Sequence, residues 1–364
     1  MKKQNRNWQG EIDVEKLSLC VDLFGCPNRC GHCWLGHMPN RDMGQEADRW
    51  IVERFQPYYQ QIEFYSWLRE PDFCPDYRAR WERDKALSVG CVPERFELAS
   101  FWRLVRDPDY VNFLKELGVP AVQLSFFGLE QTTDRMIGRK GAFRELLEAT
   151  ELLLAHGIRP RWQAFLDEEN REELVSLLRL SERLELGPRC EALGGAFQFF
   201  VHAGSCDGEN RKRYPIRIRK GHVPEELIPY YWGYDKLRSE AELYEALAEE
   251  KVPFVPRQEG SLVLYVSNTF DLYFNFTHMR PEWRIGNLRE ELVEELIRRV
   301  READTPALRR ARDISLGELV RRYGDPGSER LFDREDFSMW LLNCHLEQPW
   351  SQSEKNEKTG RNAI

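Results

Sequence analysis

The sequence predicts an α/β fold, and three observations support that prediction. Short apolar runs with the length of buried strands recur along the chain up to about residue 205. Amphipathic segments of helical length separate them. Strands that alternate with helices form parallel sheets with right-handed crossovers. Six such units are too few for a closed eight-stranded barrel, so we expect a partial (β/α)6 TIM-like barrel, followed by a C-terminal α+β extension.

The elements follow in a regular order. The expected strands are residues 17–24, 61–67, 95–101, 121–127, 158–166 and 196–201. The expected helices between them are residues 48–55, 77–87, 109–117, 143–156 and 172–184. The segment 143–156 shows the helical pattern clearly, because Leu146, Thr150 and Leu153 share one face. Glycines follow the ends of two of these helices, at Gly118 and Gly157.

The pattern changes beyond residue 205. The C-terminal region is expected to hold helices at 240–250, 288–303 and 307–323, and a hairpin of residues 262–266 and 270–276. We therefore divide the chain into four segments. They are an N-terminal lead (1–15), the partial barrel (16–205), the C-terminal extension (206–350) and a polar tail (351–364) that we expect to be disordered.

Composition excludes several classes of protein. Hydrophobic residues make up 41% of the chain and charged residues 31%, which is typical of a soluble globular protein. The net charge of −8 argues against a nucleic-acid partner, because phosphate binding needs clustered Lys and Arg. No apolar run reaches 18 residues, so we expect no membrane contact. The polar N-terminus lacks a secretory pattern, so we expect a cytoplasmic protein.

Three of the nine cysteines stand together after the first expected strand, in Cys26-Pro-Asn-Arg-Cys30-Gly-His-Cys33. In a reducing compartment such crowding indicates metal ligation rather than disulfides. Iron–sulfur clusters are usually held by four thiolates, so three would leave one iron of a cubane open. The alternative is a zinc site with His32 or His37 as fourth ligand. Structural zinc sites usually use two separated cysteine pairs, and this sequence has no second pair.

This spacing after a first strand resembles the signature of the radical S-adenosylmethionine (SAM) superfamily. The resemblance implies a [4Fe-4S] cluster on Cys26, Cys30 and Cys33, with SAM bound at the open iron. His32 stands where the family usually has an aromatic residue, beside the cofactor.

Two further segments resemble the same family, and the resemblance covers about residues 16–205. Glu70-Pro71 resembles the family's Gly-Gly-Glu-Pro segment, whose glutamate grips the SAM amine, although both glycines are replaced here. Residues 122–143 resemble the fourth strand and following helix of the peptide-modifying branch. That likeness implies that Ser125 contacts the SAM ribose or carboxylate, and that Arg135 or Arg139 meets the carboxylate.

The C-terminal region resembles a degenerate SPASM or twitch extension of that branch. Residues 271–275 and 283–288 follow its pattern, but Asn275 stands where the family usually has a cluster-ligating cysteine. Cys344 is the only later cysteine in the sequence. We therefore expect no auxiliary cluster.

Other candidate residues lie near the expected barrel mouth. Cys206 follows the sixth expected strand, and a thiol there could return a hydrogen atom to a product radical, or it could be an inert buried cysteine. Cys74 is a second candidate for the same role. His202 could act as a base or simply end its strand, and the aromatic residues between 230 and 234 could line a pocket or serve packing.

The resemblance implies reductive cleavage of SAM and hydrogen abstraction by a 5′-deoxyadenosyl radical. The expected substrate is a peptide or a small natural product, and the expected electron donor is a flavodoxin or ferredoxin. Without an auxiliary electron acceptor, a redox-neutral outcome such as epimerisation, rearrangement or elimination is expected. Two alternatives stay open, which are an oxidative enzyme that cross-links peptides and a non-catalytic zinc-binding protein.

Overall fold

The computed structural model describes residues 16–44, 46–256, 262–276 and 279–349. The expected N-terminal lead and polar tail lie outside these residues. Parallel strands form the two main sheets. β1 (Lys16–Val21) pairs with β2 (Gln61–Tyr65), and β3 (Ala121–Phe126), β4 (Arg159–Phe165) and β5 (Gln198–His202) form a second parallel sheet. The α/β fold class is confirmed.

The expected third strand, residues 95–101, is wrong. Residues 95–100 have no regular secondary structure, and Phe101 begins the short helix α3 (Phe101–Leu104). The Ser100 side chain caps that helix by accepting a hydrogen bond from Arg103 N. A backbone hydrogen bond of 3.0 Å from Gln123 N to Glu97 O joins this segment to β3. The barrel wall is therefore irregular between β2 and β3.

The C-terminal hairpin is confirmed, and its position was not expected. β7 (Leu262–Val266) and β8 (Asp271–Phe274) pair antiparallel, and β9 (Gly286–Asn287) extends the sheet. β7 also pairs in parallel with β1, so the sheet runs β2-β1-β7-β8-β9. Residues on both sides of the expected boundary at 205 thus share one sheet, and the division into two segments stays a prediction.

Helices surround these sheets. The helices of the barrel half are α1 (Ala47–Phe55), α2 (Tyr77–Leu87), α4 (Pro108–Glu116), α5 (Glu130–Ile137), α6 (Ala142–Ala155), α7 (Arg171–Arg183) and α8 (Leu186–Glu191). The later elements are β6 (Arg238–Ser239), α9 (Glu240–Leu247), α10 (Val293–Arg301), α11 (Pro306–Arg312), α12 (Leu316–Tyr323), β10 (Leu331–Phe332) and α13 (Arg334–Leu346). Short 3-10 turns cover Gln56–Tyr58, Asn210–Ile216, Glu225–Tyr230, Tyr234–Lys236 and Pro281–Trp283. The helix expected at 307–323 is split, because Ser315 caps α12.

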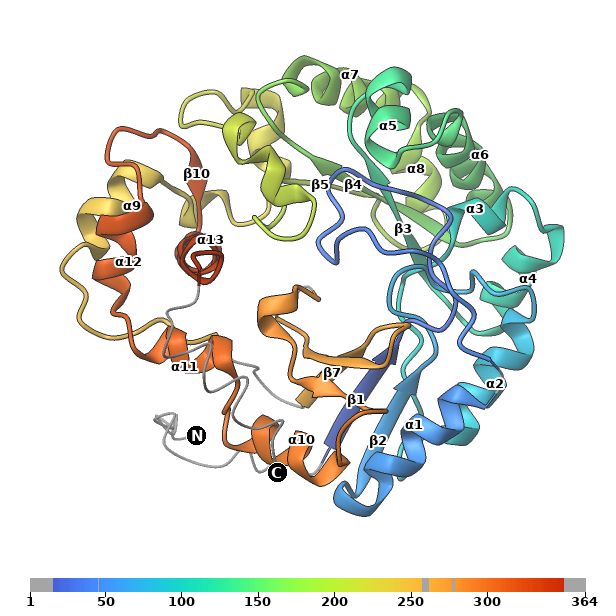
Figure 1. Cartoon of the computed structure of the whole chain (residues 1–364). Helices are drawn as coiled ribbons and strands as arrows, with labels where there is room; N and C mark the ends of the chain where they lie inside the picture. The colour runs from blue at the N-terminus through green and yellow to red at the C-terminus, as the bar shows by residue number, and fades with distance from the viewer. Residues whose placement is uncertain (1–15, 45, 257–261, 277–278, 350–364) are drawn as a thin grey trace, which may run out of the picture.

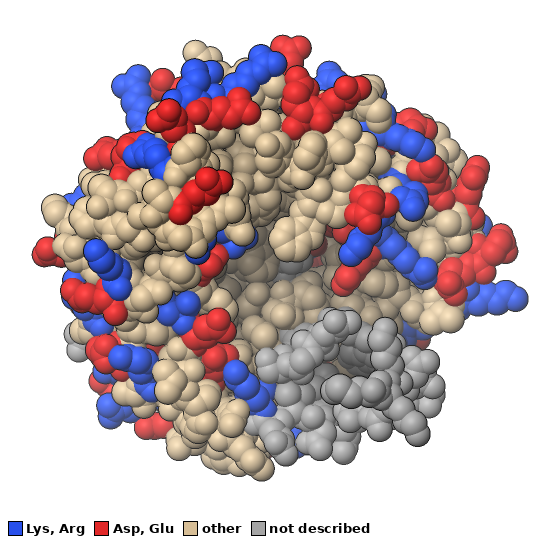
Figure 2. All heavy atoms as spheres, turned by 180° about the vertical axis from the view of Figure 1, so that it is seen from behind, with Lys and Arg blue, Asp and Glu red and all other residues tan. Residues whose placement is uncertain are grey.

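The elements form a ring with helices outside and strands inside (Figure 1). One buried apolar cluster joins β1, β2, β7 and β8 to α1 and α10–α13, and a second joins β3–β5 to α4–α8. The segment after β1, which carries the three cysteines, lies in the middle of the ring (Figure 1). Seen from behind, the surface is hollowed near its centre, and most charged side chains stand around that hollow (Figure 2). Within the described residues, every helix is too short or too polar to span a membrane.

Candidate active site

The cysteine loop is anchored to the C-terminal end of α5. Arg29 N and Gly31 N donate to the carbonyl oxygens of Ile137 and Met136, at 3.0 and 2.7 Å. A helix leaves its last carbonyl groups without partners, so the loop satisfies groups that the helix cannot. Gly138 has a φ of +74°, and a Cβ there would lie 2.8 Å from Arg29 O. The close approach of loop and helix therefore requires glycine at position 138.

Asn40 makes two hydrogen bonds to the backbone of the first cysteine. Its Oδ1 accepts from Cys26 N at 3.0 Å, and its Nδ2 donates to Cys26 O at 2.8 Å. Arg69 holds the same part of the loop, because it pairs with Asp22 and donates to Met38 O at 2.8 Å. Sequence reasoning missed both residues, since neither belongs to the cysteine motif.

The donor set of the loop fits an iron–sulfur cluster. Cys26, Cys30 and Cys33 are free thiols in one short irregular segment. Burial raises the pKa of all three, and their mutual repulsion as thiolates raises the pKa of Cys26 and Cys30 further. Iron would supply the positive charge that three buried thiolates need. Within the described residues, no group of three His, Cys, Asp or Glu side chains surrounds a point as ligands of one ion would. The thiolates of a cubane instead bind different iron atoms.

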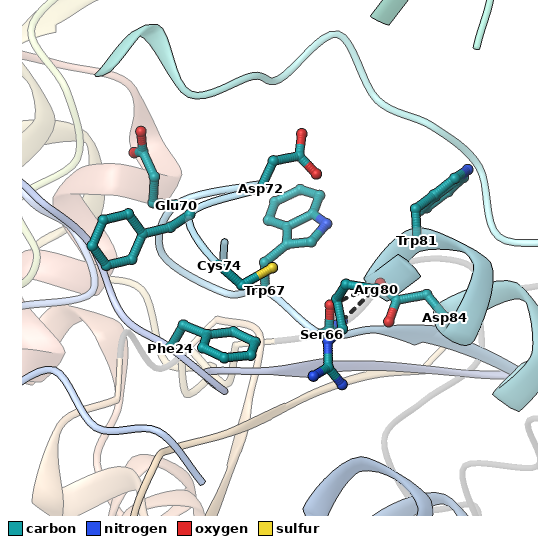
Figure 3. Close-up of a pocket in the computed structure, with 10 residues that line it drawn as sticks. Phe24, Ser66, Trp67, Glu70, Asp72, Cys74, Arg80, Trp81 and Asp84 are labelled. Atoms are coloured by element: carbon teal, nitrogen blue, oxygen red, sulfur yellow. Dashed lines mark hydrogen bonds between the residues drawn. The ribbon is translucent and has the colours of Figure 1, made fainter. Parts of the chain in front are cut away.

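Glu70 lies beside the first cysteine. Ser100 Oγ donates to Glu70 Oε1 at 2.6 Å, and Cys26 Sγ lies 3.7 Å from Glu70 Oε2. Burial raises the pKa of Glu70 to about 7. Its carboxylate points away from the hydrogen-bonded pair of Ser66 and Asp84 in the pocket that also holds Cys74 (Figure 3). Ser100, like Asn40, could not be recognised from the sequence.

The structure separates the two candidate arginines. Arg139 Nε donates to Asn28 Oδ1 at 3.1 Å, which ties it to the cysteine loop, and Nη1 donates to Glu145 at 2.6 Å. Its Nη2 is buried and has no hydrogen-bond partner among the described residues. Arg135 is exposed in α5. Arg139 is therefore the arginine with a buried donor beside the cluster loop.

His32 and Ser125 lie on the inner side of the barrel. The His32 ring packs 4.3 Å from the rings of both Phe127 and Phe165, measured between centroids. Burial first, and His202 second, lower the pKa of His32 to about 3. Ser125 Oγ lies 3.1 Å from Gln163 Oε1, and Gln163 Nε2 lies 2.5 Å from His202 Nε2. A polar chain thus links Ser125 to His202.

Cys206 is buried beside a fixed guanidinium. Arg217 Nη1 donates to Cys206 Sγ at 3.2 Å, and Arg217 Nη2 donates to Asp336 at 2.5 Å. Burial raises the pKa of the Cys206 thiol, so it stays protonated at neutral pH. A small cavity lined by Cys206 is also lined by His32. Cys74 is buried too, and burial raises its pKa to about 12.

A cavity of about 550 Å³ opens beside these groups. Gln163 and His202 of the barrel line it together with Arg217 and the first turn of α13. Tyr231 and Trp232 also line it, and Trp232 N donates to Val201 O of β5 at 2.9 Å. Tyr230 packs on Phe199, and Tyr234 packs on Tyr231. The aromatic segment therefore contributes to the pocket through two of its members, while the other two serve packing.

Comparisons with known proteins agree with this geometry. Residues 21–180 match the family model described as Radical SAM superfamily. The search of curated proteins gives no match. The structure of native anSMEcpe with bound AdoMet and Cp18Cys peptide has a TM-score of 0.52 and 12% identity, over 94% of this chain and 99% of that chain. The structure of Streptococcus suis SuiB bound to precursor peptide SuiA has a TM-score of 0.40 and 11% identity, over 87% of this chain and 75% of that chain.

The likeness to anSMEcpe shows a shared fold, and the family model covers the cysteine loop, β2–β4, Glu70 and Arg139. The iron–sulfur interpretation is therefore selected over zinc. The cofactors of this family are a [4Fe-4S] cluster and SAM. Residues 21–180 form a radical SAM domain, and the chain is a radical SAM enzyme.

Proposed function

We propose that this enzyme binds a single [4Fe-4S] cluster on Cys26, Cys30 and Cys33 and removes a hydrogen atom from a peptide or small natural-product substrate. When bound, the cluster and SAM supply a 5′-deoxyadenosyl radical through one-electron cleavage of the sulfonium carbon–sulfur bond. The observation that carries the proposal is the convergence of Glu70 and Arg139 on the cysteine loop, where they contact Cys26 and Asn28. The cavity of about 550 Å³ offers space for a substrate, and its lining residue Gln163 contacts Ser125. The electron donor is expected to be a flavodoxin or ferredoxin.

The polar residues around the loop would hold SAM. Glu70 would accept a hydrogen bond from the ammonium group of SAM, and Ser100 would hold the Glu70 carboxylate in place. Arg139 would donate from its unpartnered Nη2 to the SAM carboxylate. Ser125 would meet the ribose from β3, and His32 would pack near the cofactor from its place between Phe127 and Phe165.

Cys206 would act as hydrogen donor in a redox-neutral reaction. The bound cofactors would leave a radical on a substrate carbon. The Cys206 S–H bond then breaks, and its hydrogen atom forms a new C–H bond on the substrate radical. The sulfur radical left behind takes one electron from the flavodoxin or ferredoxin and one proton from solvent. The buried, protonated thiol beside Arg217 supports this role.

The alternative outcome is a net oxidation that cross-links the substrate, in which the bound cluster would serve as electron acceptor and solvent would take the proton lost from the second bonding group. The shared fold with anSMEcpe, whose structure contains a bound peptide, supports including peptides among the substrates. The two outcomes differ at Cys206. Epimerisation in deuterium oxide would place deuterium on the product carbon, and Cys206→Ala would stop this incorporation while SAM cleavage continues.

The first experiment incubates reconstituted enzyme anaerobically with SAM and dithionite and measures 5′-deoxyadenosine by chromatography. Wild type should form it, the Cys30→Ala variant should not, and the Cys91→Ala variant should behave as wild type. Brown, reduced wild type that forms none, with or without candidate peptides, would contradict the proposal. Iron content tests the single cluster, because one cubane gives about four irons per chain and two give about eight.

A further inference from the structure

The cavity of about 550 Å³ has an unbalanced charge. Four carboxylates line it, on Asp207, Asp333, Glu335 and Asp336, and one guanidinium, on Arg217. Arg217 is already paired with Asp336 at 2.5 Å. His202 also lines the cavity, but burial and the nearby Arg217 lower its pKa to about 4, so it is neutral at pH 7. The lining therefore carries a net negative charge.

The carboxylates differ in their availability. Asp207 is buried and accepts from Asn343 Nδ2 at 2.6 Å. Asp333 caps α13 through one oxygen, which accepts from Asp336 N at 2.8 Å. Glu335 is exposed and makes no ion pair within the described part of the chain. Glu335 and the second oxygen of Asp333 are thus the acceptors that face solvent at this cavity.

Aromatic side chains form another part of the lining. Phe200, Tyr231, Trp232 and Phe276 all contribute, and Trp232 is 73% exposed. Trp232 is not isolated but shares one cavity lining with the other three rings, and contiguous apolar surface of this kind is typical of ligand-binding grooves. Phe200 shows which chemistry suits these rings, because the Arg161 guanidinium lies 5.0 Å from its centroid. Aromatic faces beside unpaired carboxylates favour organic cations.

We propose that this cavity binds a cationic group of the substrate, an ammonium or guanidinium, with Glu335 and Asp333 as its anionic partners and Trp232 as its aromatic partner. A basic side chain of a peptide and a free small amine share this chemistry. The inference names the substrate class of the proposed hydrogen-abstraction site, and so it rests on the proposed function. Gln163 lines the cavity and contacts Ser125, which connects a cation held here to the proposed SAM site.

Binding is measured by ligand-observed NMR titration of the reconstituted enzyme with three probes. They are acetyl-Gly-Lys-Gly-amide, its norleucine analogue of similar shape without charge, and n-butylammonium. The lysine peptide should bind at least about fivefold more tightly than the norleucine peptide, because one ion pair contributes roughly 1 kcal/mol. Comparable binding of n-butylammonium would show that a free amine suffices, and weaker binding would show that the peptide backbone contributes.

Substitutions of lining residues test whether the cavity causes the preference for the lysine peptide. Glu335→Gln combined with Asp333→Asn should abolish the lysine preference, and Asn retains the capping ability at position 333. Trp232→Leu should weaken binding of the lysine peptide. The matched control is Glu318→Gln on α12, which removes a carboxylate that does not line the cavity and should leave the preference unchanged. Equal binding of the lysine and norleucine peptides to wild type, or a preference that survives the double substitution, would overturn the inference.

This test separates the two proposals. It needs no SAM cleavage, so a lysine preference without 5′-deoxyadenosine formation would sink the proposed function and leave the cation site standing. Formation of 5′-deoxyadenosine without a charge preference would support the proposed function and contradict the cation site.

Discussion

Leu19 of β1 pairs with Leu264 of β7 in parallel register, and both side chains are fully buried. The strand that leads into the cysteine loop is therefore covered along one edge by a strand from the C-terminal hairpin. Cluster binding and the C-terminal region are structurally connected through this pair.

Leu264→Ala should lower the free energy of unfolding by about 2–5 kcal/mol, because it leaves a cavity in a closed core. The control is Leu292→Ala, since Leu292 is 74% exposed and its truncation should change stability by less than about 0.5 kcal/mol. Urea unfolding of both variants checks this. Equal stability of the two variants would show that β7 does not contribute to the core around β1.

The cysteine loop predicts a specific loss of metal. Cys26→Ala, Cys30→Ala and Cys33→Ala should each lower the iron bound after anaerobic reconstitution to well below about four per chain and reduce the visible absorption of the cluster. Cys190→Ala is the matched control, because Cys190 is a buried cysteine of α8, outside the cysteine loop. Iron loss in the control as large as in the loop variants would indicate general misfolding instead of lost ligation.

Asn40 should matter although it binds no iron. Asn40→Ala removes two hydrogen bonds to the backbone of Cys26 and should destabilise the loop by about 1–3 kcal/mol. Reconstituted Asn40→Ala should release iron to a chelator faster than wild type. Asn40→Asp is the informative companion, because it can accept from Cys26 N but cannot donate to Cys26 O. Iron release rates equal to wild type in both variants would show that the Asn40 hydrogen bonds do not stabilise the cysteine loop.

The sequence predicted the elements that depend on local patterns. The strands around Leu19 and Val122 and the hairpin around Leu264 are short apolar runs, and the structure contains them. The pairing of β7 with β1 could not be predicted, because any apolar strand can join a sheet edge and nothing local selects the partner. Residues 95–101 have the local pattern of a strand and do not form one. Their alternation reads as a strand, but Arg95 bonds to Asp72 and to Leu98 O, and Ser100 starts a helix.

In the candidate site, too, local sequence patterns indicated some residues and could not indicate others. Cysteine spacing indicated the cluster, because its ligands lie within one loop. Asn40, Arg69 and Ser100 act through contacts across 14 to 47 positions in sequence, and such polar residues carry no distinctive pattern. Arg135 and Arg139 looked equivalent in sequence. They differ because the chain turns at Gly138, which leaves one exposed on α5 and brings the other to Asn28.

That difference gives a prediction on cofactor affinity. Arg139→Gln should raise the Kd for SAM by about tenfold or more, because a hydrogen bond to a charged group contributes about 1.5–3 kcal/mol. Arg135→Gln should leave the Kd unchanged, since its side chain is exposed. Equilibrium dialysis with labelled SAM measures both, and the iron content of each variant shows whether the cluster is intact. A larger effect from Arg135→Gln would reverse the assignment.

The polar chain through His202 predicts a pH dependence of stability. Burial, and next the charge of Arg217, lower the folded-state pKa of His202 to about 4, whereas an unfolded histidine has a pKa of about 6.5. Between these values the unfolded chain binds a proton that the folded chain excludes, so the free energy of unfolding falls as pH drops from about 6.5 toward about 4.

His202→Gln removes this titration and can keep a hydrogen bond to Gln163. Denaturant titrations from pH 7.5 to 4.5 should therefore show a shallower loss of stability for the variant than for wild type. Burial lowers the pKa of His32 in both proteins, and the variant loses only the smaller effect of His202 on that pKa, which also makes its loss of stability shallower. Parallel curves would show that His202 is protonated as easily in the folded protein as in the unfolded chain.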